Sequence, residues 1–521
     1  MATLIRSGDR VLDALQLADR ASRAAAGLEA MGVGQGDTIA LFLRNDLAFF
    51  EATGAASRAG AYVAPLNWHA TEQEAAYLFT NCEAKLIVIH ADLLGGVAAA
   101  IPDGVQVMVV ETAPDIAAAY GVGPDQCRVP ADRTSWNDWL DALPPSPPRL
   151  PIALSAIIYT GGTTGNPKGV RRAPPTPEQA AAGYRALGTA FGFGEAVKAV
   201  LSGQEPPHFV TVMAGPMYHS APNAYGNSAA AMGAEVILQA RFDPEELLAL
   251  VERHRVTHLH LVPTMMIRLL KLPEDVRAKY DLSSLKNVVH AAAPCPPHVK
   301  RGMIEWWGPV INEYYGSTET GAVVYCTSED WLAHPGTVGK AMDEAVVRVL
   351  REDGSDADVG EPGDVYCRMT RMTDFTYHGD DEKRRKTESQ GLIGVGDIGY
   401  LDEDGFLFLC DRRNHMVISG GVNIYPAEIE NELLRVAGVA DCAVFGIPDD
   451  EFGESLCAWV QPNPGETLDA ADIRIALGEK LARYKVPKVI EFSPELPRED
   501  SGKIFKRKLR EPYWEAAGRR I

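Results

Sequence analysis

The stretch TGGTTGNPKG, residues 160–169, directly follows the apolar run ALSAIIY at 153–159. The apolar run predicts a buried strand. Four glycines let the backbone after it bend and approach a ligand closely. Three threonine hydroxyls, free backbone N–H groups and Lys168 would together cradle phosphate oxygens. The stretch is not a Walker loop, since Lys168 lies between a proline and a glycine, and it lacks the dinucleotide pattern GxGxxG.

The composition excludes several classes of protein. The chain has 521 residues, of which 46% are hydrophobic and 23% charged, as is usual for a globular protein of more than one domain. The formal net charge of −20 argues against nucleic acid or anionic lipid as the main partner. No apolar run reaches the roughly 18 residues that an integral membrane segment needs. Residues 1–19 lack the basic stretch and apolar core of a signal peptide.

The cysteine and histidine patterns do not indicate a metal site. The eight cysteines form no CxxC pair, so neither a zinc site nor a disulfide framework is expected. Scattered thiols fit a reducing compartment, and we expect a cytoplasmic protein. His258 and His260 would share one face of a strand and could in principle bind a metal, but no third ligand is near in sequence. We therefore expect an ordinary packed pair.

Helix and strand patterns alternate along the chain, which predicts an α/β fold with a mostly parallel sheet. We expect helices at 21–31, 72–79 and 242–253, and strands at 38–43, 60–66, 85–89 and 258–263. Five prolines between residues 142 and 151 mark a connector.

A domain boundary is predicted near residue 410, where a strand at 405–410 is followed by the polar run DRRNH. We expect helices at 426–436 and 470–481, and strands at 441–445, 456–460 and 488–492. The sequence thus predicts a large N-terminal multi-subdomain α/β body, residues 1–410, and a small α+β C-terminal unit, residues 411–521, whose length is within domain range.

Further motifs follow the glycine-rich stretch in order. They are PMYH at 216–219, HAAAP at 290–294, YYGSTE at 314–319, GD at 396–397, DR at 411–412, GG at 420–421, YKVPK at 484–488 and SGK at 501–503. Together with GDTIA at 36–40 they resemble the acyl-adenylate-forming (AMP-binding) superfamily. That superfamily includes acyl- and aryl-CoA synthetases, peptide-synthetase adenylation domains and beetle luciferase.

The resemblance implies an ATP-dependent carboxylic acid–CoA ligase. The acid would react with ATP to give acyl-AMP and pyrophosphate, and CoA would then displace AMP. ATP, Mg²⁺ and coenzyme A are the expected cofactors, a small-molecule acid is the expected partner, and a homodimer stays open. The acyl pocket, expected near 217–227 and 290–293, is apolar in sequence, so fatty, aromatic and other apolar acids stay open.

The resemblance also implies an ATP site. The residues expected to hold the β- and γ-phosphates are Thr160, Gly161, Gly162, Thr163, Thr164, Gly165, Pro167 and Lys168. Glu319 would coordinate Mg²⁺, a hard cation suited to oxygen ligands, and Thr318 would contact the α-phosphate. An alternative interpretation of these two residues is a helix-capping box. The adenine site, formed mainly by backbone, would be lined by Ala292, Ala293, Glu313, Tyr314, Tyr315, Gly316 and Ser317.

Three charged residues complete this implied site. Asp397 is an acceptor-only carboxylate that can take both ribose hydroxyls. Arg412 would reach the ribose or a phosphate. Lys503 would touch both the acid carboxylate and the α-phosphate, where a cation offsets their repulsion and holds them near attack distance.

The second half-reaction implies a moving C-terminal lid with its hinge at Asn414. The residues expected to enter the site in that state are Ser419, Gly420 and Gly421. His219 would gate the tunnel for the pantetheine arm of CoA. The residues expected near the CoA nucleotide are Phe452, Tyr484 and Lys488.

Four positions depart from the usual family pattern, and their effect stays open. They are Gly161, Val395, His415 and Val486. Two other functions also stay open, a stand-alone adenylation enzyme with a different acyl acceptor and a catalytically inactive nucleotide-binding homologue. No acid follows the gate motif in SAPNAYG, residues 220–226, where an amino-acid-activating enzyme usually has aspartate. A luciferase-like oxygenase is excluded only weakly.

Overall fold

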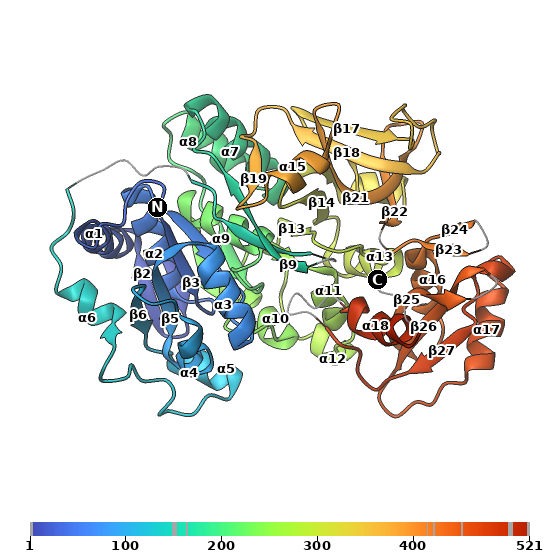
Figure 1. The fold of residues 1–521 in the computed structure, drawn as a ribbon, viewed down its shortest axis with the longest axis horizontal. Helices are drawn as coiled ribbons and strands as arrows, with labels where there is room; N and C mark the ends of the chain where they lie inside the picture. Colours follow the sequence, from blue (N-terminus) through green and yellow to red (C-terminus); the bar gives the residue numbers. More distant parts are fainter. Residues whose placement is uncertain are drawn as a thin grey trace.

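The computed structural model describes residues 4–147, 154–162, 165–413, 415–419, 422–449, 452–498 and 504–517. The strands of these residues form five sheets, and helices pack against them. Figure 1 shows a large body, coloured from blue through green to light orange, and beside it a smaller C-terminal unit in dark orange and red. The predicted α/β class, with a body and a small C-terminal unit, is confirmed.

The first sheet is fully parallel and consists, in order, of β4 (Tyr62–Pro65), β3 (Thr38–Phe42), β5 (Ala84–His90), β6 (Gln106–Val110) and β7 (Thr134–Ser135). Its helices are α1 (Ala14–Ala30), α2 (Leu47–Ala59), α3 (Glu72–Asn81), α4 (Ala91–Val97), α5 (Pro114–Tyr120) and α6 (Trp136–Asp141). Leu86 and Val88 of β5 pack in one core with residues of α1 and α2, and Ile87 and Ile89 pack in another with residues of α3 and α4. Covered faces on both sides explain why the middle of β5, residues 86–89, is apolar throughout.

Helix α1 begins seven positions before the predicted start at residue 21, at Ala14 rather than Ala21. The side chain of Asp13 accepts a hydrogen bond from the backbone of Gln16, and the side chain of Gln16 accepts one from the backbone of Asp13. This reciprocal capping box satisfies two backbone donors at the helix start.

The second sheet runs in the order β16 (Lys340–Ala341), β15 (Gly321–Cys326), β14 (Ile311–Ser317), β13 (Asn287–His290), β12 (His258–Leu261), β10 (Val210–Met213), β11 (Glu235–Leu238), β1 (Leu4–Ser7) and β2 (Arg10–Asp13). Its helices are α7 (Pro177–Phe191), α8 (Gly194–Leu201), α9 (Ser220–Ala231), α10 (Pro244–His254), α11 (Pro263–Leu270), α12 (Glu274–Arg277), α13 (Pro297–Trp307) and α14 (Ser328–Ala333). Strands β10, β12, β13 and β14 are parallel, so the segments that follow them leave from the same edge.

Two smaller sheets complete the body. One holds β8 (Ile158–Gly162), β9 (Gly165–Arg172) and β19 (Phe375–Tyr377). The other holds β17 (Ala345–Leu350), β18 (Gly363–Met369), β20 (Glu388–Ser389), β21 (Leu392–Leu401) and β22 (Leu407–Arg412), beside helix α15 (Asp381–Lys386). The strand predicted at 153–159 was wrong in its bounds. It begins at Ile158, where pairing with β9 begins, and continues into the glycine-rich stretch.

The C-terminal unit has its own sheet of β24 (Val422–Ile424), β23 (Val417–Ser419), β26 (Gly453–Pro462), β25 (Val439–Asp449) and β27 (Val489–Phe492). Its helices are α16 (Pro426–Leu433), α17 (Ala470–Gly478) and α18 (Lys506–Ala516). The unit has a core of its own around Ile424, Ile429, Val444 and Leu456. The change from the body to this unit falls between β22 and β23, because β22 still pairs with β21 of the body.

Two observations on the described residues bear on the surroundings of the protein. None of their helices combines the length and the apolar character that crossing a membrane requires. All eight cysteines are described, and all are free thiols.

A buried ion pair joins α13 to β14. The Nζ atom of Lys300 lies 2.6 Å from Oε2 of Glu313, and the Lys300 side chain is fully buried. Burial raises the pKa of Glu313, and the neighbouring ammonium of Lys300 opposes that rise. The Nε2 atom of His290 in β13 lies 3.5 Å from the same carboxylate oxygen. Glu313 lies on β14, the same strand that continues into the YYGSTE motif.

We expect Lys300→Met to lower the free energy of unfolding by about 3–5 kcal/mol, because it leaves the buried Glu313 carboxylate without its counter-charge. The pKa of Glu313 in the folded protein would rise further above its pKa in the unfolded chain. The stability of the variant should therefore fall as the pH rises from the unfolded-state pKa of Glu313 through its folded-state pKa. Urea unfolding at acidic and alkaline pH measures this. The double variant Lys300→Met/Glu313→Gln should recover part of the lost free energy of unfolding. If the effects of the two single substitutions on that free energy simply add in the double variant, the pairing is contradicted.

Candidate active site

The glycine-rich stretch forms a β-hairpin rather than a loop between other elements. Thr160 on β8 is the Cα partner of Lys168 on β9, and Gly162 is the partner of Gly165. The hydroxyl of Tyr77 in α3 donates to the Pro167 carbonyl at 3.0 Å, which ties the hairpin to the first sheet. Thr163 and Thr164 lie outside the described residues.

Lys168 projects from this hairpin toward a cluster on β19 and α15. Its Nζ atom lies 3.5 Å from Oδ2 of Asp380 and 5.8 Å from the centre of the Tyr377 ring. The Nζ atom of Lys383 lies 6.0 Å from the same ring. Burial and the neighbouring Lys168 ammonium lower the pKa of Lys383. Two ammonium groups are therefore held close together, and the carboxylates of Asp380 and Glu319 lie near enough to act on them.

The segment 317–321 is a tight turn between β14 and β15. The hydroxyl oxygen of Ser317 accepts hydrogen bonds from the backbone of Glu319 at 3.2 Å and of Thr320 at 3.1 Å. A Cβ atom at Gly316 would meet the Gly321 carbonyl oxygen at 1.9 Å, so only glycine fits there. The turn joins two antiparallel strands, so the helix-capping interpretation of this motif was wrong.

The Glu319 side chain points toward the hairpin cluster. The Tyr377 hydroxyl donates to Oε1 of Glu319 at 2.9 Å. Tyr377 pairs with Val170 in the register of β19 and β9. The structure thus brings together Lys168 and Glu319, which lie 151 positions apart in the sequence numbering (319 minus 168).

Asp397 lies on β21 and is buried. The Tyr315 hydroxyl donates to its Oδ2 atom at 2.7 Å, and Arg412 on β22 is its Cα partner. Tyr315, Asp397 and the backbone of Arg412, all expected at the nucleotide site, therefore lie together. Val395, on the same strand, packs against the apolar cluster of Val170 and Phe375, which gives this departure from the family pattern a structural reason.

The expected adenine wall is formed by two neighbouring segments. Ala292 has a left-handed φ of 75°, a conformation that glycine adopts with less strain. The Glu313 carboxylate is occupied by Lys300, and the Tyr314 hydroxyl lies 3.2 Å from Nε2 of His260. These two side chains are engaged in the interior, so the segment can offer its backbone to a ligand. Burial lowers the pKa of His260 to about 4, as expected for a packed neutral histidine.

His219 immediately precedes α9, on the edge where β10 ends. Its ring is half-buried and lies 4.4 Å from the ring of Tyr218, which in turn contacts Trp68 at 6.3 Å. Farther along α9, Gly226 faces Met213 and Met217 within 3.3 Å of where a Cβ atom would lie. Small and apolar side chains therefore line this helix beside the proposed gate.

The C-terminal unit contacts the body at α11. The Nζ atom of Lys271 donates to the Ala440 carbonyl at 3.1 Å, and Asp441 next to it forms an ion pair with Arg498. The base of the segment that carries Lys503 therefore lies on the side of the unit that meets the body. Four expected residues of the predicted C-terminal unit lie outside the described residues, namely Asn414, Gly420, Gly421 and Lys503.

The expected CoA-contacting residues are only partly brought together. Lys488 lies 4.6 Å from the Phe452 ring and 2.8 Å from Asp449, so these residues share one surface. Tyr484 is exposed, and the cation described over its ring is Lys485 rather than Lys488. Ser419 pairs with Gly453 at the edge of β23.

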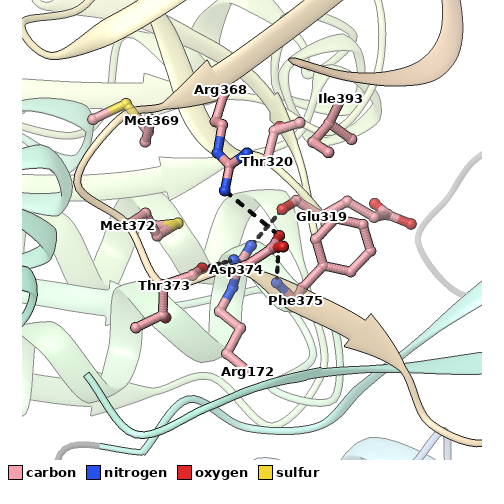
Figure 2. Close-up of a pocket in the computed structure, with 10 residues that line it drawn as sticks. All are labelled: Arg172, Glu319, Thr320, Arg368, Met369, Met372, Thr373, Asp374, Phe375 and Ile393. Atoms are coloured by element: carbon pink, nitrogen blue, oxygen red, sulfur yellow. Dashed lines mark hydrogen bonds and ion pairs between the residues drawn. The ribbon is translucent and has the colours of Figure 1, made fainter. Parts of the chain in front are cut away.

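Sequence reasoning missed residues that contact this site, and Figure 2 shows one of them, Arg172. Its guanidinium lies beside the Glu319 turn, and burial lowers its pKa to about 10. Tyr377, Asp380 and Lys383 were also missed. The signal available in sequence was the basic run DEKRRK at 381–386, which by itself indicates only a solvated helix.

Comparisons with known proteins show the family of this chain. The family model described as AMP-binding enzyme matches residues 3–374, and the AMP-binding enzyme C-terminal domain matches residues 428–503. The chain therefore belongs to the AMP-binding enzyme family. Feruloyl-CoA synthase of an Amycolatopsis species is 32% identical over 98% of this chain and 96% of that protein.

Two further relatives extend the comparison. The indoleacetate–CoA ligase of Aromatoleum aromaticum is 30% identical over 98% of this chain and 94% of its own length. The ATP-bound crystal structure of MatB from Rhodopseudomonas palustris has a TM-score of 0.82 at 28% identity, covering 98% of this chain and 95% of that one.

We expect Tyr315→Phe to raise the KM for ATP about tenfold, because it removes a hydrogen bond to the Asp397 carboxylate that would orient it toward a ribose. Pyrophosphate release at varied ATP measures this. Tyr400→Phe is the matched control. Tyr400 lies on β21, the strand of Asp397, but its ring stacks on the ring of Phe408 at a centroid distance of 5.0 Å. An equal rise in both variants would contradict a role for the Tyr315 hydroxyl.

Proposed function

We propose that this chain is an AMP-forming carboxylic acid–CoA ligase that uses ATP, Mg²⁺ and coenzyme A. The observation that carries the proposal is the convergence of Lys168, Glu319 and the Tyr315–Asp397 pair at one edge of the body. Full-length relatives named as CoA ligases support the same activity.

In the first half-reaction, a carboxylate oxygen attacks the α-phosphorus of ATP and the bond to pyrophosphate breaks. In the second, the thiolate of CoA attacks the acyl carbon, and AMP leaves with the electron pair of the acyl–oxygen bond. A free carboxylate resists thiol attack because its carbonyl is a poor electrophile. Adenylation replaces its oxide leaving group with a phosphate of low pKa.

The described residues fit a magnesium nucleotide. Glu319 offers carboxylate oxygens, which are hard ligands of the kind Mg²⁺ prefers. Bound there, Mg²⁺ would neutralise charge on the phosphates. Lys168 lies at the hairpin where the terminal phosphates would rest, Thr318 would contact the α-phosphate, and Asp397 would accept the ribose hydroxyls. The role of these residues is to hold the anions in place without solvent rearrangement.

For the second half-reaction we propose that residues 411–521 move as a lid about Asn414. Lys503 would withdraw, Gly420 and Gly421 would approach, and His219 would open the pantetheine tunnel. The eight free thiols support a reducing compartment, and we propose a cytoplasmic location.

We propose that the acid carries a ring or another bulky apolar group. The relatives named for feruloyl-CoA and indoleacetate support this, as do the small side chains of Ala221 and Ala224 beside the gate. A carrier protein is the alternative acceptor, because a fatty acid–[acyl-carrier-protein] ligase of Streptomyces coeruleorubidus is 28% identical over 98% of this chain.

The function is tested with a panel of acids that includes ferulate, indoleacetate, a saturated fatty acid and acetate. We expect AMP formation that depends on both CoA and a ring-bearing acid, read as AMP and acyl-CoA by chromatography. Transfer to an acyl-carrier protein in place of CoA would favour the alternative acceptor. An absence of CoA-dependent AMP with every acid would overturn the ligase proposal.

We also expect Lys503→Ala to separate the two half-reactions. Adenylation should fall by about a hundredfold or more, because the cation that offsets carboxylate–phosphate repulsion is lost. Thioester formation from supplied acyl-AMP should survive. Lys508→Ala, an exposed lysine of α18, is the control and should affect neither step. An equal loss in both half-reactions would count against the moving lid.

A further inference from the structure

Arg172 ends strand β9 and turns its side chain into the body rather than toward solvent. The residue is 9% exposed, whereas Arg171 before it lies over the ring of Tyr62 at 4.3 Å. In Figure 2 the Arg172 guanidinium reaches from β9 toward the turn that carries Glu319 and toward Thr373.

The guanidinium donates hydrogen bonds to backbone carbonyls of two separate segments. One nitrogen donates to Thr318 at 3.1 Å and to Glu319 at 2.5 Å, and another donates to Thr373 at 2.6 Å. A buried cation is costly unless its donors are satisfied, and here backbone carbonyls satisfy them. Arginine suits this task because its planar fork presents several donors in fixed directions.

These bonds connect two parts of the proposed phosphate site. Lys168 stands four residues before Arg172 on the same strand, so both side chains lie on the same face of β9. The hydrogen bonds of Ser317 and Thr320 close the Glu319 turn on itself but do not connect it to β9. Arg172 makes that connection through the carbonyls of the two residues expected to meet the α-phosphate and Mg²⁺.

We propose that Arg172 is a positioning residue that fixes the Thr318–Glu319 turn relative to the phosphate hairpin and thereby sets the affinity for magnesium nucleotide. The proposal rests on the proposed function of this site. Arg172 touches neither substrate nor metal, and it acts through the backbone of Thr318 and Glu319.

Arg384 provides a matched control. It is also a buried arginine, 7% exposed, and it pairs with Asp374 at 2.8 Å and Glu388 at 2.9 Å. It donates to the Phe375 carbonyl at 3.1 Å, two residues from Thr373. Its described partners lie in the 374–388 region and not in the Glu319 turn, so its loss removes a buried cation without releasing that turn.

The test compares Arg172→Met, Arg172→Lys and Arg384→Met in the full chain. Pyrophosphate release at saturating ATP and acid gives the half-saturating Mg²⁺ concentration. Acyl transfer from supplied acyl-AMP gives the second half-reaction. Hydrogen–deuterium exchange of residues 317–321, in the absence of metal and nucleotide, reports the turn itself.

We expect Arg172→Met to raise the half-saturating Mg²⁺ concentration about tenfold and to speed exchange in the turn, with acyl transfer nearly unchanged. Arg172→Lys should have a half-saturating Mg²⁺ concentration and a turn-exchange rate between those of the wild type and of Arg172→Met. If the methionine variant does not fold, the lysine variant provides the test. Arg384→Met should lower the midpoint of thermal unfolding but leave both Mg²⁺ dependence and turn exchange unchanged.

The proposal is overturned if the Arg172 variants leave Mg²⁺ dependence and turn exchange unaltered, or if Arg384→Met changes them equally. If the wild type itself forms no acyl-CoA with any acid, the proposed function fails separately. Exchange in the turn, together with the thermal shift caused by Mg·ATP, still decides the positioning role in that case.

Discussion

The pairing of β9 with both β8 and β19 is the constraint on which the rest of the site depends. One strand supplies the returning arm of the phosphate hairpin, the Lys168 side chain and the neighbour for Tyr377. Tyr377 then meets Glu319 from the second sheet. Backbone pairing thereby aligns the hairpin with β19, and the Tyr377 hydroxyl then links β19 to the Glu319 turn.

Much of the fold was predictable because its signals are local. The buried strands at 38–43 and 85–89 and the helix at 72–79 follow from apolar runs and a capping threonine, and the structure places β3, β5 and α3 there. The order of the nucleotide motifs was likewise visible, because each motif is a short contiguous string. The early start of α1 was missed because an exposed capping box has no apolar periodicity.

The contacts behind the motifs were not predictable, because they depend on which face of a strand a residue occupies. Arg171 and Arg172 are adjacent and chemically identical, yet one lies over Tyr62 at the surface and the other is buried against the Glu319 turn. Which of the two arginines faces the interior depends on the register of β9. That register involves pairing with Phe375, some two hundred positions later in the chain. The pairing of Asp397 with Tyr315 likewise joins two different sheets.

The net charge of −20 gains a different meaning once the cations are located. Burial lowers the pKa of Lys383, and the nearby Lys168 ammonium adds to that lowering, so two cationic side chains are gathered in one region at the hairpin. Asp380 and Glu319 oppose the lowering, and the Asp380 side chain is 41% exposed. An acidic protein can therefore still attract a polyphosphate, since a ligand responds to the field in its cleft rather than to the total charge. The excess of acidic side chains elsewhere keeps that positive region local, which favours a small anion over an extended polyanion such as nucleic acid.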